Sequence, residues 1–206
     1  EEIKFLAGKY KRNEFEIADS IFNGDIPRIE KICDLCTKEK LDISWSAKVS
    51  ARKEMNYCLL KKMRDAGCRS LSYGVESASP RILRDMRKND DTQEIQRIVR
   101  DTCNAGIQAN CFFIIGYPLE TEEDFALTLD FVKENARYIS RFAQITGCHI
   151  EDDSYLGHHL DQYGIVFKDD GWHSQFSTPE IRKERLARFR DLARQLHSHY
   201  RCEVQE

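Results

Sequence analysis

Polar side chains recur where predicted β-strands end. The stretch LSYGVESAS, residues 71–79, alternates apolar and small residues and then finishes on Glu76. In open parallel sheets and α/β barrels, ligands bind at the carboxyl ends of the strands. A carboxylate there can accept hydrogen bonds from ligand hydroxyls or from an ammonium group. The other strand-end groups are Asp19 with Ser20, Ser46 to Lys48, Ser77, the Gly116-Tyr117-Pro118 turn, and Gln144 to Thr146.

A binding mouth explains these groups better than a packed core does, because each buried unpaired polar group costs about 1–3 kcal/mol. Ser70, Ser72 and Gly74 share one strand face with Glu76 and leave space beside it. Simpler interpretations stay open. A single strand-end Glu often caps a helix or pairs with a cation, and Lys88 at a helix end can simply favour the helix dipole.

The elements that position these residues alternate along the chain. Strands are expected at 14–19, 42–49, 69–76, 107–116 and 141–147, each preceded by a helix. Strict alternation predicts right-handed crossovers and a parallel sheet. Five units are too few for a closed eightfold barrel, so an open or partial barrel or a doubly wound sheet remains. The expected helices are 1–12, 26–40, 54–66, 79–88, 92–105, 121–136 and 178–200, and an irregular acidic and aromatic segment fills 148–177.

The composition is that of an ordinary globular protein. The chain has 206 residues, a formal net charge of -3, 41% hydrophobic and 33% charged residues. This balance gives no general attraction to nucleic acid or to an anionic membrane. Neither a bilayer-length apolar run nor a signal-peptide pattern is present, so we expect a cytoplasmic location. The chain opens directly on a helical pattern, as a piece cut from a longer protein would.

The eight cysteines include one close pair, Cys33 and Cys36. Together with Ile29 and Ile32 they fall on one face of a predicted helix. A structural zinc site would need a second pair, which the spacing does not provide. We therefore expect buried thiols here, with a redox or metal pair as the lesser alternative.

Two motifs resemble a known family when they are taken together. The segments MRDAGCRSLSYGVESASPRILRDMRK and CNAGIQANCFFIIGYPLETEEDFALTLDF resemble the radical S-adenosylmethionine superfamily. The nearest branch is the cobalamin-associated one, which contains Mg-protoporphyrin monomethyl ester oxidative cyclase-like proteins. The resemblance covers about residues 1–147. It implies an α/β fold, a partial (β/α)6 TIM-like barrel with parallel strands, of which this chain holds five of six strands plus a C-terminal helical extension at 148–206.

The resemblance also implies a chemistry. In this family a 4Fe–4S cluster, held by a CxxxCxxC loop after the first strand, reductively cleaves S-adenosylmethionine to a 5′-deoxyadenosyl radical. That radical abstracts hydrogen from a small-molecule substrate, and a donor such as flavodoxin or ferredoxin supplies the electron. The cluster ligands would lie upstream of Glu1, as would any cobalamin domain of a methyltransferase or oxidative cyclase. The 206 residues alone would then be inactive as a radical initiator.

Roles carried over from the family fall on the strand ends. Asp19 and Ser20 would hold the methionine amino group, and Glu76, with Ser77 beside it, the ribose hydroxyls. Lys88 or Arg87 would pair with the methionine carboxylate. The remaining expected cofactor contacts are Ile114, Gly116 and Pro118 along the adenine, Gln144 in the same pocket, and Ser46 and Lys48 toward cofactor or substrate.

The chain also departs from the family pattern. It contains no CxxxCxxC, it has Ala18 where a paired Asp is usual and Leu119 where Gly is usual, and CHIEDDS replaces a Pro-x-Pro-Gly-Thr-like turn. Two rival functions follow. One is a degenerate barrel that acts as a binding or scaffold module. The other is a conventional barrel lyase or hydrolase that uses Glu76 and His149 as acid and base.

Overall fold

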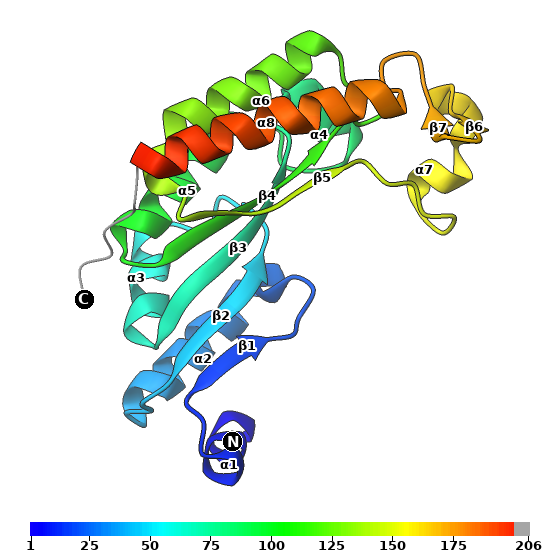
Figure 1. The fold of residues 1–206 in the computed structure, drawn as a ribbon. Coiled ribbons are helices and arrows are strands. Elements are labelled where there is room, and N and C mark those ends of the chain that lie inside the picture. Colours follow the sequence, from blue (N-terminus) through cyan, green and yellow to red (C-terminus); the bar gives the residue numbers. More distant parts are fainter. Residues whose placement is uncertain (200–206) are drawn as a thin grey trace.

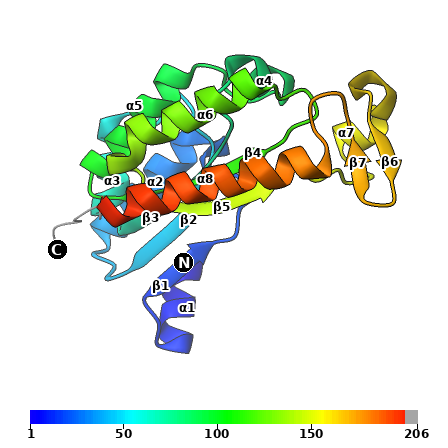
Figure 2. The same ribbon diagram turned by 45° about the horizontal axis from the view of Figure 1, so that its top comes forward.

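The computed structural model describes the backbone of residues 1–199 and the side chains of residues 1–196. Five parallel strands form one sheet in the order β1-β2-β3-β4-β5, as the alternation predicts. The sheet curves, and the long helices pack along one side of it (Figure 1; Figure 2). The strands are β1 Glu14–Ile17, β2 Ser44–Val49, β3 Cys68–Glu76, β4 Gln108–Ile115 and β5 Arg141–Gly147. The helices of this unit are α1 Glu2–Tyr10, η1 Phe22–Gly24, α2 Ile26–Lys38, α3 Tyr57–Asp65, α4 Pro80–Asp85, α5 Thr92–Asn104, α6 Glu122–Asn135, η2 Ala136–Tyr138 and α8 Pro179–His199.

The core lies between the sheet and its helices. On β3, Leu71, Tyr73 and Val75 are buried, whereas Ser72 and Gly74 between them stay partly exposed. This alternation follows from the two-residue period of a strand. The buried Tyr73 hydroxyl is hydrogen-bonded to Thr102 of α5 at 2.8 Å, so its polar end is satisfied. The sheet and helices therefore share one continuous core.

The other face of the sheet is polar. Lys48, Ser72, Asn110 and Arg141 are register partners on four successive strands and form one row across it. None of the described helices lies on this face in Figures 1 and 2. Parallel sheets are ordinarily covered and apolar on both faces. A polar, uncovered face is therefore the side on which a ligand can be received.

The segment 148–177 is more ordered than the sequence predicts. It contains α7 Tyr155–His158, η3 Leu160–Tyr163 and an antiparallel hairpin of β6 Val166–Lys168 and β7 Gly171–His173. Ile150, Tyr163 and Trp172 pack with Ile82 and Tyr117 in a second hydrophobic cluster. These elements are three or four residues long, too short to leave a periodic pattern. They lie beyond the ends of β4 and β5 (Figure 1).

Element ends differ from the predicted ones by at most three residues, and one difference affects the site. The helix expected at 79–88 ends at Asp85, because Arg87 adopts a left-handed conformation with φ 55°. The backbone N–H of Lys88 then donates to the carbonyl of Leu83 at 2.9 Å. This turn directs Lys88 back toward the end of β3.

Two further expectations concern the cysteines and the membrane. Cys33 and Cys36 are buried on α2, as predicted, and burial raises the pKa of Cys33 to about 12. In residues 1–199, no helix has both the length and the apolar character that a membrane span requires.

Candidate cofactor site at the strand ends

Glu76 ends β3 in an unusual conformation. Its φ is 64°, in the left-handed region that costs a non-glycine residue roughly 1–3 kcal/mol. The carboxylate bends back over the strand, so a Cβ added at Gly74 would lie 2.5 Å from Glu76 Oε1. A side chain at position 74 would therefore displace the carboxylate from its place over the strand. Such local strain points to a site whose geometry serves a function.

Lys88 is the partner that the structure records for this carboxylate. Lys88 Nζ lies 3.1 Å from Glu76 Oε1, and the Glu76 side chain is 13% exposed. Arg87, the other cation considered from the sequence, instead places its guanidinium over the ring of Tyr155, 4.5 Å from the centroid. The structure thus brings Glu76 and Lys88 together at the end of β3.

The turn of residues 116–120 follows β4 and is called here the cofactor turn, because the family resemblance predicts adenine contacts at Gly116 and Pro118. Gly116 has φ 77° and donates its N–H to Glu120 Oε2 at 2.7 Å. Its carbonyl accepts from Ser177 Oγ, and the carbonyl of Pro118 accepts from Ser174 Oγ, both at 2.7 Å. These backbone groups are already satisfied. The carbonyl of Tyr117 accepts the N–H of Glu120 at 2.9 Å, so a ligand at this turn would contact the N–H of Tyr117 or the partly buried side chain of Ile114.

Glu120 closes the turn with a buried ion pair. Its side chain is fully buried and pairs with Arg185 Nη1 of α8 at 3.1 Å. Its other oxygen, Oε1, is buried without a hydrogen-bond partner. Burial raises the pKa of Glu120 to about 7, against the opposing effects of the Gly116 N–H and Arg185. The sequence analysis did not single out either residue; only the long-range packing of α8 reveals them.

The remaining predicted residues are more scattered. Asp19 is paired with Arg28 at 2.8 Å, and Ser20 is exposed. Ser77 is fully buried. Its hydroxyl lies 3.3 Å from that of Thr128 and accepts the N–H of Ser79, so it is hydrogen-bonded within the protein interior. Gln144 is exposed and is the register partner of Phe112. Their roles toward a cofactor stay predictions.

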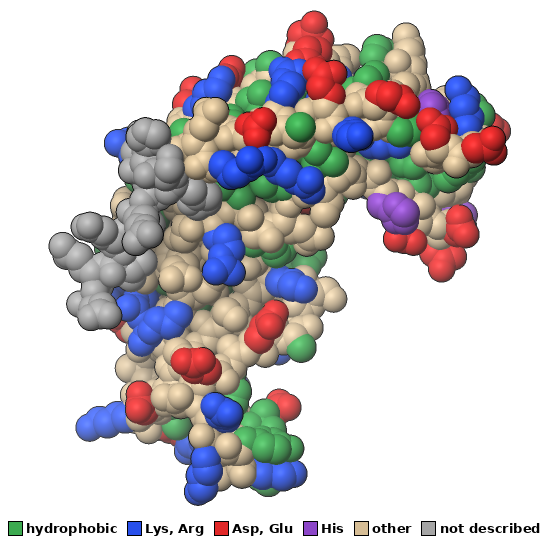
Figure 3. Space-filling view, in the orientation of Figure 1, with side chains coloured by type: hydrophobic (Ala, Val, Ile, Leu, Met, Phe, Trp, Pro, Cys, Tyr) green, Lys and Arg blue, Asp and Glu red, His purple; other side chains and the backbone are tan. Residues whose placement is uncertain are grey.

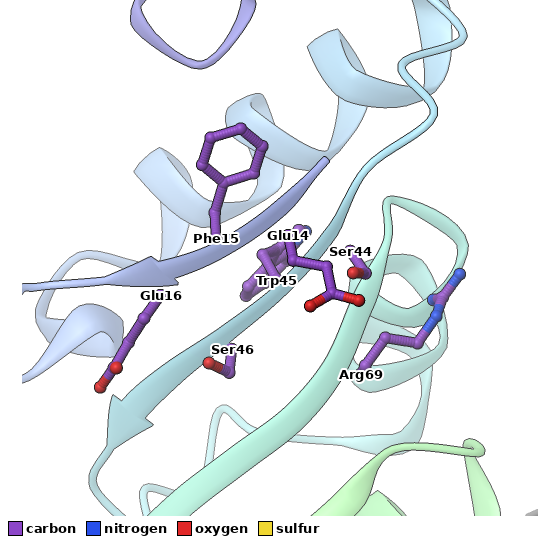
Figure 4. A pocket seen from close by; sticks show the side chains of 7 residues that line it. All are labelled: Glu14, Phe15, Glu16, Ser44, Trp45, Ser46 and Arg69. Carbon is purple, nitrogen blue, oxygen red and sulfur yellow. The ribbon is translucent and has the colours of Figure 1, made fainter. Parts of the chain in front are cut away.

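A shallow hollow lies near the β1 edge of the sheet. It is lined by residues of β1 and β2 with Arg69 of β3, and it includes the predicted Ser46. In Figure 4, the side chains of Glu14, Glu16 and Ser46 project to one side of the strands, while the ring of Phe15 points to the other. Ser46 thus belongs to a different part of the sheet surface from the Glu76–Lys88 pair. The alternation of EFEI marks a strand with its glutamates on one face, but no pattern in the sequence indicates a hollow.

The acid–base pair proposed for a conventional lyase is not supported. His149 is largely exposed, and its Nε2 lies 3.4 Å from Glu151 Oε1. Across the described residues, no contact joins His149 to Glu76.

The residues suit S-adenosylmethionine but not an iron–sulfur cluster. The Glu76 carboxylate can accept hydrogen bonds from ribose hydroxyls, and the Lys88 ammonium beside it can bind the carboxylate of the methionine part. Within residues 1–199, no group of three or more His, Cys, Asp or Glu is placed to hold a metal. Cys33, Cys68 and Cys111 lie on three different elements and are buried in the hydrophobic core, and burial raises the pKa of each thiol.

Comparisons with known proteins identify the family of the chain. The Radical SAM superfamily model matches residues 2–132. An uncharacterized methyltransferase from Pyrococcus horikoshii is 36% identical over 166 residues, which is 81% of this chain and 34% of that protein. The chain thus spans about a third of that relative. The chain belongs to the radical SAM superfamily.

Solved structures support the fold. Coproporphyrinogen III oxidase from Escherichia coli, described as a radical SAM enzyme, superposes with a TM-score of 0.67 at 20% identity, over 95% of this chain and 44% of that one. The radical S-adenosylmethionine methyltransferase TsrM from Kitasatospora setae, solved with cobalamin and a [4Fe–4S] cluster, gives 0.58 at 18% identity, over 65% and 27%. The sheet is thus a partial radical SAM barrel.

Proposed function

We propose that the protein containing this chain is a radical S-adenosylmethionine enzyme that transfers a methyl or methyl-derived group to a small molecule. The observation that carries the proposal is the strained Glu76, held over Gly74 and paired with Lys88, in a chain of this superfamily. The methyltransferase relative favours group transfer over the oxidative cyclisation that the sequence resemblance also suggested. The methyltransferase neighbour solved with cobalamin makes that cofactor part of the proposal.

Each residue has a distinct role in this proposal. S-adenosylmethionine bound here supplies the methyl group or the radical. Glu76 accepts hydrogen bonds from its ribose hydroxyls, and Lys88 neutralises its carboxylate. The cofactor turn and Ile114 limit the space for its adenine. The polar, uncovered row of Lys48, Ser72, Asn110 and Arg141 then receives the substrate.

The experiment uses the full-length protein, purified without oxygen and reconstituted with iron and sulfide. Electron paramagnetic resonance would detect a reducible 4Fe–4S cluster, and dithionite with S-adenosylmethionine should release 5′-deoxyadenosine. Glu76→Gln should weaken S-adenosylmethionine binding at least tenfold, because the amide loses the charge that binds hydroxyls most strongly. The matched control is Glu14→Gln, which makes the same change on the open face of the sheet but in the hollow at β1 and β2.

Other results would select a rival. A full-length protein that forms no cluster, yet still binds a small molecule, is a degenerate barrel. Turnover in air without iron indicates a conventional lyase. Transfer of label from methyl-labelled S-adenosylmethionine to product, with and without added cobalamin, separates methylation from cyclisation.

A further inference from the structure

The C-terminal part of the chain completes the cofactor turn. The contacting residues are Ser174, Ser177, Arg182 and Arg185, called here the C-terminal brace. They lie outside residues 2–132, which the superfamily model matches. The brace and the turn are separated by about sixty residues of sequence, yet several side chains of the brace reach backbone atoms of the turn. The turn is therefore shaped by a segment that the family pattern does not include.

Two serines hold the carbonyls of the turn. Ser177 is fully buried, and its Oγ donates to the carbonyl of Gly116 at 2.7 Å. Ser174 Oγ donates to the carbonyl of Pro118 at 2.7 Å. The serines are also joined to each other, because the N–H of Ser174 donates to the carbonyl of Ser177 at 2.9 Å. They bind the turn as one unit.

Arg185 holds the far end of the turn. Its Nη1 donates to the backbone carbonyl of Glu120 at 2.9 Å and lies 3.1 Å from Glu120 Oε2. The same Oε2 accepts the N–H of Gly116 at 2.7 Å. The carboxylate thus connects the first residue of the turn to α8. Because both side chains are buried, removing the guanidinium would leave an uncompensated charge.

Arg182 fills the space beside the turn. A Cβ at Gly116 would overlap the aliphatic chain of Arg182. The guanidinium stacks on the ring of Trp172, 3.8 Å from the centroid, and donates to its backbone carbonyl at 2.8 Å. Position 116 therefore favours glycine for two reasons. Its φ is left-handed, and the side chain of Arg182 occupies the space that a Cβ would need.

We propose that the brace sets the conformation of the cofactor turn that receives the adenine end of S-adenosylmethionine, and that Arg185 is its main positioning residue. Arg185 acts through Glu120 and does not touch the cofactor. This inference rests on the proposed function. It goes further by assigning cofactor affinity to a segment outside the matched family region.

The test measures two quantities on the full-length protein. Equilibrium dialysis gives the Kd of S-adenosylmethionine, and hydrogen exchange gives the protection of amides 116–120. Arg185→Met and Ser177→Ala should each raise the Kd about tenfold or more and speed exchange at Gly116. Arg188→Met should change neither the Kd nor the exchange rate. The guanidinium of Arg188 is also on α8, but it pairs with Glu122 and does not contact the turn. Arg185→Lys should recover part of the affinity.

A double variant separates positioning from folding. Glu120→Met with Arg185→Met removes both buried charges, and such replacements often restore stability. We expect its Tm to recover while its Kd stays high. A Kd that recovers together with the Tm would overturn the proposal, as would an unchanged Kd in Arg185→Met. If the wild type binds no S-adenosylmethionine, the proposed function itself fails and the positioning role falls with it.

Discussion

At the scale of single residues, the end of β3 depends on a glycine and an acid two positions apart. Gly74 leaves the space that the carboxylate of Glu76 fills, and the Glu76 backbone takes a conformation that few non-glycine residues adopt. Lys88 then lies within ion-pair distance. The arrangement explains why a strand with one buried face finishes on a charged group.

The first prediction concerns Gly74→Ala. The added methyl group would meet Glu76 Oε1 at 2.5 Å and displace the carboxylate. We expect the Kd for S-adenosylmethionine to rise about tenfold, which corresponds to about 1.4 kcal/mol. Equilibrium dialysis measures it. Gly8→Ala in α1 is the control, since a Cβ there meets nothing within 4 Å. Equal affinity in both variants would remove Glu76 from the binding site.

The second prediction concerns pH. Burial raises the pKa of Glu120 from 4.5 in the unfolded chain to about 7 in the folded one. The folded state then binds the proton more tightly, so this group favours folding below about pH 4.5 and loses that contribution as the pH rises to about 7. Urea unfolding across this range should show wild-type stability falling relative to Glu120→Gln. A constant difference between the two proteins would show that the pKa of Glu120 is not raised.

The sequence could indicate some of these residues and not others. The family resemblance assigns Glu76 to the ribose and Lys88 or Arg87 to the methionine carboxylate, and these roles stay predictions; the ion pair between Glu76 and Lys88 is a finding of the structure. The backbone conformation of Glu76 and the inward direction of Ser77 depend on packing against Gly74 and Thr128, which no local pattern records. Glu120 and Arg185 are 65 residues apart, so only the tertiary structure pairs them.

At the scale of elements, hydrophobic periodicity predicted the strands and long helices well. It failed at 148–177, where α7, η3 and the β6–β7 hairpin are held by aromatic packing and by one carboxylate. Asp85 Oδ2, at the end of α4, accepts from Tyr117 at 2.6 Å and from Tyr163 at 2.9 Å. Side-chain contacts of this kind have no period and escape a pattern-based prediction.

The third prediction therefore concerns Tyr163→Phe. It removes the hydroxyl that ties η3 to Asp85, and we expect a loss of about 1 kcal/mol in unfolding free energy. Hydrogen exchange in residues 155–173 should become faster, while exchange in β3 stays unchanged. Tyr155→Phe serves as the comparison, because its ring stacks on His159 at 4.0 Å but no hydrogen bond of its hydroxyl is described. Equal effects in both variants would show that the hydrogen bond between Tyr163 and Asp85 does not stabilise this segment.

At the scale of the whole molecule, the sheet has one covered face and one open face. Figure 3 shows Lys and Arg side chains on the open face of the sheet, with Asp and Glu side chains among them. Among the described strands β1 pairs only with β2, so its outer edge offers unpaired backbone groups. Such an edge is a template for another strand. The proposed division of the chain at residue 147 stays a prediction at this scale.

The fourth prediction is that the 206-residue chain self-associates through the edge of β1. Light scattering over a dilution series should give a molecular mass that falls toward that of the monomer as the protein is diluted. An exposed apolar side chain is a second possible source of association, and Phe5 on α1 is 64% exposed. The variant Phe5→Ser tests this source. A monomer at every concentration contradicts the prediction, and a monomer in Phe5→Ser alone assigns the contact to α1.

The distance in sequence between the brace and the cofactor turn also determines when their contacts can form during synthesis. Gly116 can bind Ser177, and Glu120 can bind Arg185, only after the later residue has been synthesised. Each of these two contacts closes a loop of more than sixty residues. A nascent chain on the ribosome can build the β-strands in order as they emerge. Its turn at residues 116–120 is held only after α8 has left the exit tunnel, so the conformation that we propose for binding S-adenosylmethionine is completed last.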